Sequence, residues 1–176
     1  MRSISLVAAS VLMLSGAQLS AQTFGPPIAG MCLLSRSSAV SMSQVNQSLQ
    51  SQLGQLRGRL SSELSNRRNA IEQQIRALEA ARNTIAPIEY ERQKAELERQ
   101  AQLLDQQQNS AFIAAQTRGQ QQIDKVLNQA LSRVITSRAC SVVVERDGAY
   151  GWNNEMDITG AVTREMDIIA TSVSVG

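Results

Sequence analysis

The two cysteines of the chain, Cys32 and Cys140, are the side chains best suited to covalent chemistry, because two thiols can be oxidised to one disulfide. The sequence contains no histidine, which removes the commonest general base and the commonest metal ligand. Two cysteines without histidine do not make a metal site of ordinary composition. The pair therefore predicts a structural disulfide, with two buried free thiols or a bond between chains as the alternatives.

The carboxylates do not form a pattern that suggests catalysis. Glu89 and Glu91, like Asp157 and Asp167, fall on exposed faces or at the ends of expected helices. An active site needs polar groups that converge in a cleft, and the sequence has no glycine-rich phosphate loop. We therefore expect no enzyme activity, no catalytic residue, no metal and no cofactor.

A long part of the chain has the apolar periodicity of a helix. From residue 45 to residue 78 the apolar side chains recur after four, four and three positions, which gives a repeat of eleven residues. This repeat corresponds to about 3.67 residues per turn and predicts straight or slightly right-handed packing. Ser37, Ser38 and Ser41 are suitable N-caps before this helix. The apolar positions are Val45, Leu49, Leu53, Leu56, Leu60, Leu64, Ile71, Ile75 and Leu78.

Pro87 divides the helical region, because proline cannot continue a helix interior and disfavours the α conformation of the residue before it. The same eleven-residue repeat returns between residues 101 and 134. Two helices of about 45 residues each predict an antiparallel hairpin that is roughly 65 Å long. One continuous helix with a kink at Pro87 is the alternative.

The segments on either side of the two helices are the predicted strands. Residues 28–35 form a short apolar run, and Cys140 precedes a second run with three consecutive valines at 142–144. A helical hairpin would bring both runs, and with them both cysteines, to the same end of the molecule. The valines predict a sheet that is buried on at least one face.

Two further elements are expected in the C-terminal segment. Asp147-Gly148 is a two-residue hairpin signal, with residues 149–152 as the returning strand. Asp157 or Thr159 can cap a final short helix that ends at Ile169. The expected fold is therefore mainly α with a small β part (α+β), in which a long antiparallel helical hairpin projects from a short-stranded association body. The body would comprise residues 22–40 and 139–176, and the arm residues 41–138 with its tip near 84–88.

Residues 1–21 have the features of a signal peptide. Arg2 supplies positive charge, an apolar run follows, and small residues permit cleavage after residue 17 or residue 21. The run is shorter than the roughly 20 residues that cross a bilayer, which disfavours a permanent membrane anchor. We therefore expect an exported protein.

The charge is distributed unevenly along the chain. Residues 43–138 contain thirteen Lys and Arg against nine Asp and Glu, whereas residues 139–176 contain two against six. A basic arm favours contact with an anionic partner, while ordinary solvated helix faces are the alternative interpretation.

The C-terminal sequence VVVERDGAYGWNNEMDIT, residues 142–159, carries a family resemblance. Together with the leader, the first strand and the helical hairpin, it resembles the Skp/OmpH family of periplasmic chaperones. In that family a valine-rich strand leads to a position like Ala149-Tyr150, and an Asp-Ile-Thr like that at 157–159 opens the last helix. The arm departs from the family pattern in being richer in Gln than in Lys, and two cysteines flank it.

The resemblance implies a periplasmic homotrimer whose feet associate through their strands. Its three arms would enclose unfolded outer-membrane proteins without ATP and deliver them for assembly. Contact with anionic lipid or a membrane surface is a further expectation, and no nucleic acid partner is expected. The competing function is a structural coiled-coil hairpin, as in a periplasmic adaptor or an envelope-spanning assembly.

Candidate client-binding residues lie on the arm. Its apolar stripe is interrupted by Arg67, Gln108 and Gly119, so we expect the hairpin to pack loosely and some leucines to face a bound chain. Packing of the hairpin alone is the alternative for these leucines, and hairpin packing is the expectation for Tyr90 near the tip. The candidates are Leu53, Leu56, Leu60, Leu64, Arg57, Arg67, Arg68 and Arg76.

Overall fold

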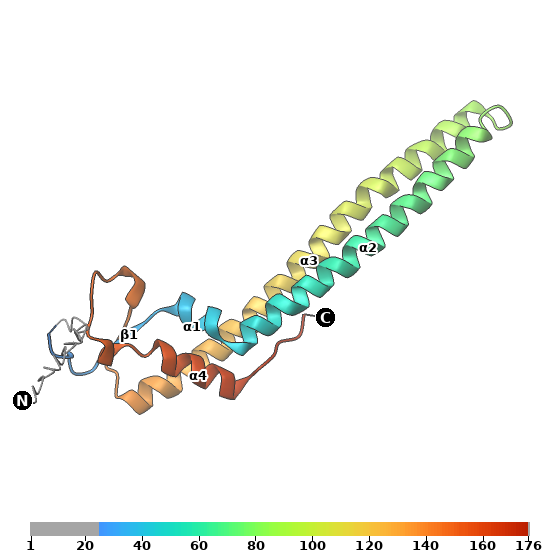
Figure 1. Cartoon of the computed structure of the whole chain (residues 1–176). Helices are drawn as coiled ribbons and strands as arrows, with labels where there is room; N and C mark the ends of the chain where they lie inside the picture. Colours follow the sequence, from blue (N-terminus) through green and yellow to red (C-terminus); the bar gives the residue numbers. More distant parts are fainter. Residues whose placement is uncertain (1–24, 176) are drawn as a thin grey trace, which may run out of the picture.

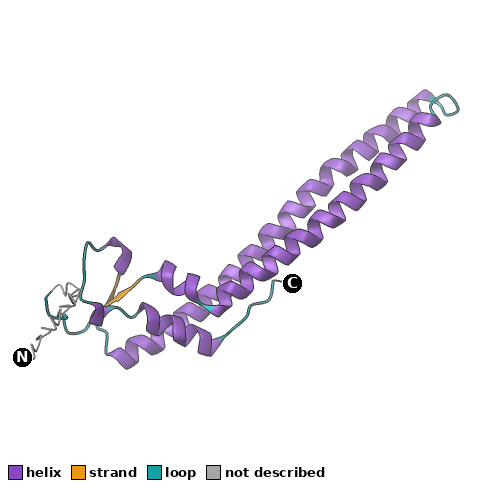
Figure 2. Cartoon of the chain, viewed as in Figure 1, coloured by secondary structure: helices purple, strands orange, loops and turns teal. Residues whose placement is uncertain are grey.

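Two long helices project as an arm from a small foot in the computed structural model, which describes residues 25–175 (Figure 1). The predicted signal peptide lies outside the described residues. Strands are confined to the foot, so the mainly α fold with a small β part is confirmed (Figure 2). The elements are β1 (Met31–Leu34), α1 (Arg36–Met42), α2 (Gln44–Ala80), α3 (Pro87–Arg138), β2 (Val142–Glu145), the 3-10 turns η1 (Arg146–Gly148) and η2 (Asn154–Met156), and α4 (Thr159–Ile169). We call α2 and α3 the arm and the remaining elements the foot.

The arm is a hairpin of two helices of unequal length. α2 has 37 residues and α3 has 52, which at 1.5 Å per residue corresponds to about 55 and 78 Å. Pro87 occupies the first turn of α3, where its missing N–H leaves no helical hydrogen bond unmade. Tyr90 is buried beside the tip, with the Arg82 guanidinium 5.5 Å from its ring centroid. The extra length of α3 continues past the base of the arm and packs against α4 (Figure 1).

Serine caps divide the first helical region into two helices. The Ser35 hydroxyl accepts a hydrogen bond from the Ser38 N–H and caps α1, and the Ser43 hydroxyl accepts one from the Asn46 N–H and caps α2. The backbone of Ser43 is extended, with φ −75° and ψ 147°, so the helix is interrupted there. Neither cap is one of the predicted serines, Ser37, Ser38 and Ser41. Those three lie inside α1 and have helical backbone, whereas an N-cap residue has extended backbone.

The two strands pair in parallel, with Met31 opposite Val142. Ala139, which ends α3 in the left-handed conformation with φ 53°, lies at the point where the chain reverses. This reversal gives β2 the same direction as β1. β1 is buried, whereas Val142 and Val144 of β2 are 47% and 42% exposed. On the opposite face of β2, Val143 packs against the apolar core, so the prediction of a sheet buried on at least one face is confirmed. The face that carries Val142 and Val144 is exposed to solvent.

The predicted hairpin at Asp147-Gly148 is wrong. These residues form η1, residues 149–152 contain no strand, and the Tyr150 side chain is fully exposed. The dipeptide favours a hairpin only through its local backbone geometry. In the structure the Asp147 carboxylate instead accepts hydrogen bonds from two serines at the start of α1, as described below. α4 ends at Ile169, in agreement with the prediction.

The apolar core lies at the base of the arm, where α2, α3, α4 and β1 meet. Gly119 of α3 is buried there, and a Cβ atom on it would overlap the Cδ1 atom of Leu49. Our prediction that Gly119 loosens the hairpin is therefore wrong. The glycine permits α3 to approach the fully buried Leu49 of α2 closely.

Candidate functional site

One arginine joins the segments that meet in the foot. The Arg146 guanidinium lies 2.9 Å from the Asp157 carboxylate and 3.1 Å from the Asp147 carboxylate, and 21% of its side chain is exposed. It also donates to the Ser38 hydroxyl at 3.3 Å and lies 5.3 Å from the centroid of the Trp152 ring. The hydrogen bond to Asp157 is the main cause that raises the pKa of Arg146. We call the following group the polar clasp: Ser35, Arg146, Asp147, Asp157 and Thr159.

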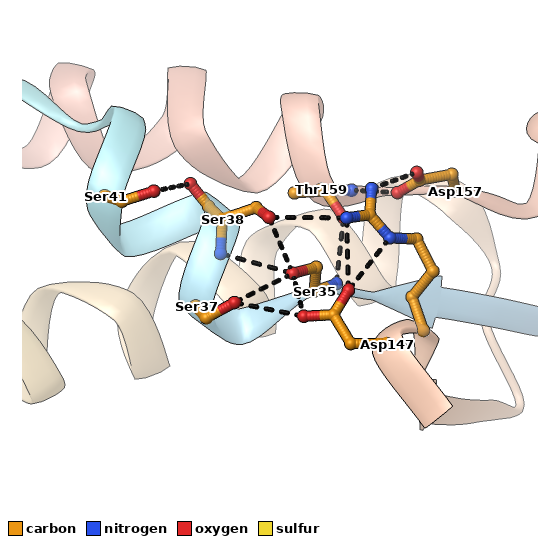
Figure 3. A network of polar contacts seen from close by, with 8 residues as sticks. Ser35, Ser37, Ser38, Ser41, Asp147, Asp157 and Thr159 are labelled. Carbon is orange, nitrogen blue, oxygen red and sulfur yellow. Dashed lines mark hydrogen bonds and ion pairs between the residues drawn. The ribbon is translucent and has the colours of Figure 1, made fainter. Parts of the chain in front are cut away.

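The Asp147 carboxylate ties this arginine to the start of α1. It accepts hydrogen bonds from the Ser35 hydroxyl at 2.6 Å and the Ser37 hydroxyl at 3.0 Å (Figure 3). These bonds, the one from Ser35 above all, and the adjacent Arg146 hold the pKa of Asp147 below its ordinary value. Asp147 is therefore ionised in the foot at neutral pH and fixes η1 against α1.

Asp157 and Thr159 connect the start of α4 to the end of β1. The Thr159 N–H donates to the Asp157 carboxylate at 2.8 Å, and the Thr159 hydroxyl accepts from the Ser35 N–H at 2.9 Å (Figure 3). Burial raises the pKa of Asp157, but hydrogen bonds from Thr159 and Arg146 outweigh it and leave that pKa below its ordinary value. The Asp-Ile-Thr sequence therefore holds the start of α4 against the end of β1.

Cys32 and Cys140 are joined by a disulfide in the structure, with Cα atoms 5.7 Å apart. This separation lies within the range that disulfide geometry allows. Cys32 belongs to β1, and Cys140 follows the end of α3. The bond therefore joins β1 of the foot to the end of α3.

The four candidate leucines of α2 occupy different environments. Leu53 is buried in the apolar core, and Leu56 is packed against that core. Leu60 and Leu64 are half-buried and border an open cavity of about 190 Å³ between α2 and α3. The structure therefore assigns Leu53 to packing and leaves Leu60 and Leu64 accessible from solvent.

Packing in the arm becomes looser towards the tip. A cavity of about 320 Å³ lies beside Ile71 and Leu104, and one of about 840 Å³ lies near the tip between Leu78, Ile85 and Leu97. These spaces are open and have apolar side chains in their walls. The distal arm is therefore built of two helices that leave apolar surface between them accessible.

Each of the four candidate arginines has a partner on the arm. Arg68 pairs with Asp105 of α3 at 2.7 Å, and the Arg57 guanidinium lies 4.8 Å from the Phe112 ring centroid. Within α2, Arg67 pairs with Glu63 and Arg76 with Glu72. Because the paired side chains remain more than 45% exposed, these pairs are weak. The arginines can therefore exchange one carboxylate partner for another.

Sequence reasoning gave no role to two parts of the molecule. Arg146 stands inside the motif that carried the resemblance, and its position between two acidic residues, Glu145 and Asp147, was the available signal. Residues 171–175 follow α4 and return to the base of the arm (Figure 1). The alternation of Val173 and Val175 with serine was the signal for this second feature.

Two kinds of feature are absent from residues 25–175. No helix in this part of the chain has the length and hydropathy needed to span a membrane. No group of three or more His, Cys, Asp or Glu side chains there is arranged to bind a metal ion.

Comparison with known proteins found one matching family model and a solved structure with a similar fold. The family model described as outer membrane protein (OmpH-like) matches residues 31–166. A solved structure of a candidate outer membrane chaperone (OmpH-like) from Caulobacter crescentus CB15 superposes with a TM-score of 0.74 at 26% identity, and the match covers 89% of this chain and 95% of that one. The comparison with curated proteins gave no match.

Proposed function

This chain belongs to the OmpH-like outer membrane protein family, and on that premise we propose that it is an ATP-independent holdase chaperone of the periplasm. Its clients would be unfolded outer-membrane proteins, which it would bind and deliver for membrane assembly. The description of the Caulobacter relative as an outer membrane chaperone supports this assignment.

The open apolar cavities along the distal arm are the observation that carries the proposal. An unfolded chain exposes apolar side chains at many positions, so a surface that binds it benefits from several small apolar sites instead of one deep pocket. Leu60 and Leu64 border one such site, and Arg67 lies between that site and the next. Exposed arginines beside apolar surface add attraction for acidic segments.

The foot is proposed to associate three copies into a homotrimer. The apolar side chains that it exposes support this: Val142 and Val144 on β2, Ile28, and Tyr150. A two-stranded sheet is rarely stable without a further covering layer or strand. Three arms on one trimer would surround a shared space, and their basic faces could also contact anionic lipid.

Suppression of aggregation tests the proposed function. An unfolded outer-membrane protein diluted out of urea should stay soluble in the presence of the full chain without ATP. The variant Leu60→Asp with Leu64→Asp should protect less, whereas Ser61→Asp with Ser62→Asp, on the exposed face of the same helix, should protect as well as the natural chain. No protection by the natural chain would favour a structural hairpin over a chaperone. Equal protection by all three chains would exclude Leu60 and Leu64 from client binding.

A further inference from the structure

The last described residues of the chain, 171–175, lie against the base of the arm, and we call this segment the tail (Figure 1). Val173 and Val175 are 8% and 6% exposed and belong to the same apolar core as residues of α2 and α3. Ser172 and Ser174 are exposed. This alternation is that of an extended segment with one buried face.

Side chains of the arm form hydrogen bonds with the main chain of the tail. Gln122 of α3 makes two bonds with Ser174, since its amide N–H donates to the Ser174 carbonyl at 2.6 Å and its amide oxygen accepts from the Ser174 N–H at 3.1 Å. Gln52 of α2 donates to the Val173 carbonyl at 2.6 Å, and Arg118 of α3 donates to the Val175 carbonyl at 2.9 Å. All four bonds therefore end on backbone atoms of the tail.

Recognition of this kind depends little on the identity of the bound segment. Peptides that add to a sheet edge gain affinity from main-chain hydrogen bonds, while the pockets for alternate side chains supply specificity. Here the amide side chain of Gln122 takes the place of a strand edge, because it offers one donor and one acceptor to the same residue. The requirement is an extended segment with small apolar residues at positions i and i+2.

We propose that Gln52, Arg118, Gln122 and the apolar core beside them form a peptide-binding site, and that the tail is its exchangeable resident. The occupant that competes with the tail is an extended segment of an unfolded protein with small β-branched residues at alternate positions. Strands of outer-membrane barrels alternate apolar and polar residues in this way. The choice of occupant therefore rests on the function proposed above.

The covalent link to α4 determines how the exchange works. A short tether holds the tail near its site at an effective concentration on the order of millimolar. An isolated segment that binds weakly is excluded, whereas a segment of a client already bound elsewhere on the arm has a comparable local concentration and can replace the tail. The resident tail thus restricts the site to clients that the arm has already bound.

Hydrogen exchange on the natural chain tests the proposal without any change in the protein. The backbone amides of residues 171–175 are measured alone, with the peptide acetyl-SVSVG-amide at roughly 10 mM, and with acetyl-SDSDG-amide as the matched control. The valine peptide should accelerate exchange of the Ser174 amide at least roughly tenfold by releasing the tail, and the aspartate peptide should not. No acceleration by the valine peptide overturns the proposal.

A truncated chain supplies the second measurement. Deletion of residues 172–176 should allow fluorescein-labelled SVSVG to bind at least roughly tenfold more tightly than it binds the full chain. Gln122→Ala in the truncated chain should weaken that binding. The proposal is contradicted if the truncated chain does not bind the peptide although its circular dichroism shows the same helix content as the full chain.

Two other outcomes are informative. Protection of the Ser174 amide that falls on dilution of the protein, without peptide, would assign the site to the tail of a second copy and overturn the proposal. Neither measurement uses a client or aggregation. If the peptide releases the tail in a protein that does not suppress aggregation, the peptide-binding site is supported and the proposed chaperone function is contradicted.

Discussion

Among the single residues, Gly119 controls how closely the two arm helices approach each other. Its replacement by alanine should gain about 1 kcal/mol of helix propensity, but a Cβ atom there would overlap the buried Leu49, and overpacking costs about 1–3 kcal/mol. We therefore expect Gly119→Ala to lower the free energy of unfolding by up to about 2 kcal/mol, as measured by urea denaturation. Gly58→Ala is the control, because a Cβ atom on Gly58 would meet no other part of the chain within 4 Å. A Gly119→Ala chain as stable as Gly58→Ala would contradict the close approach.

Arg146 is the residue on which the polar clasp depends. Arg146→Ala removes one donor from each of two carboxylates and from the Ser38 hydroxyl, and a hydrogen bond to a charged group contributes about 1.5–3 kcal/mol. We expect the free energy of unfolding to fall by about that amount. Arg164→Ala, at an exposed position of α4, should change it by less than about 0.5 kcal/mol. Equal effects of the two substitutions in thermal denaturation would rule out a structural role for the clasp.

The two clasp aspartates make stability depend on pH at the acidic end. Both have a folded-state pKa below the ordinary 3.8, so they bind fewer protons in the folded state than in the unfolded state. Their contribution to the free energy of unfolding is fully present above about pH 5. It is lost as the pH falls through 3.8 towards the lower pKa values of the folded state. Urea denaturation between pH 7 and pH 3 should show this loss, and Asp147→Asn should reduce it. A loss of the same size in Asp147→Asn would exclude Asp147 as a source.

These residue-level roles show why the sequence predicted some positions and missed others. A glycine within an apolar repeat has the same sequence signature whether it leaves a gap or admits a neighbouring helix, because the difference depends on Leu49, seventy positions away. The Asp147-Gly148 dipeptide favours a hairpin by local geometry, but the serines of α1 bind its carboxylate. Both features depend on tertiary contacts that a local pattern does not contain.

At the level of elements, the disulfide is expected to clamp the base of the arm. It closes a loop of 108 residues, and loss of a native disulfide typically costs about 2–5 kcal/mol. Cys32→Ser with Cys140→Ser should therefore lower the free energy of unfolding by at least about 2 kcal/mol. Non-reducing mass spectrometry of the purified protein is the direct measurement. Detection of two alkylatable thiols would show that the disulfide is absent, and detection of a covalent dimer would show that it joins two chains.

The long helices were the elements most open to prediction. An apolar repeat that extends over many turns and a proline that cannot lie within a helix are strong local signals, and they gave α2, α3 and the break between them. The capping serines and the parallel direction of β2 were not predictable in this way. They depend on backbone conformations at Ser43 and Ala139, which side-chain periodicity does not specify.

At the level of the whole molecule, the exposed valines of β2 predict self-association. The natural chain should have three times the mass of one chain by light scattering at micromolar concentration. Val142→Asp with Val144→Asp should shift it to the monomer, because burial of two carboxylates in an apolar interface is strongly unfavourable. Ile168→Asp is the control, since this side chain on α4 is 73% exposed and lies outside the sheet. A monomeric natural chain would contradict the trimer.

The parallel pairing of β1 with β2 also determines the order in which the chain can fold. The partners are separated by the entire arm, and contacts between distant residues form more slowly than local ones. During synthesis β1 is made first, and it has no partner strand until α3 has been made and has folded back along α2. During that interval the new chain exposes unpaired backbone and apolar side chains. A nascent copy therefore has the same physical character as the unfolded proteins that finished copies are proposed to bind.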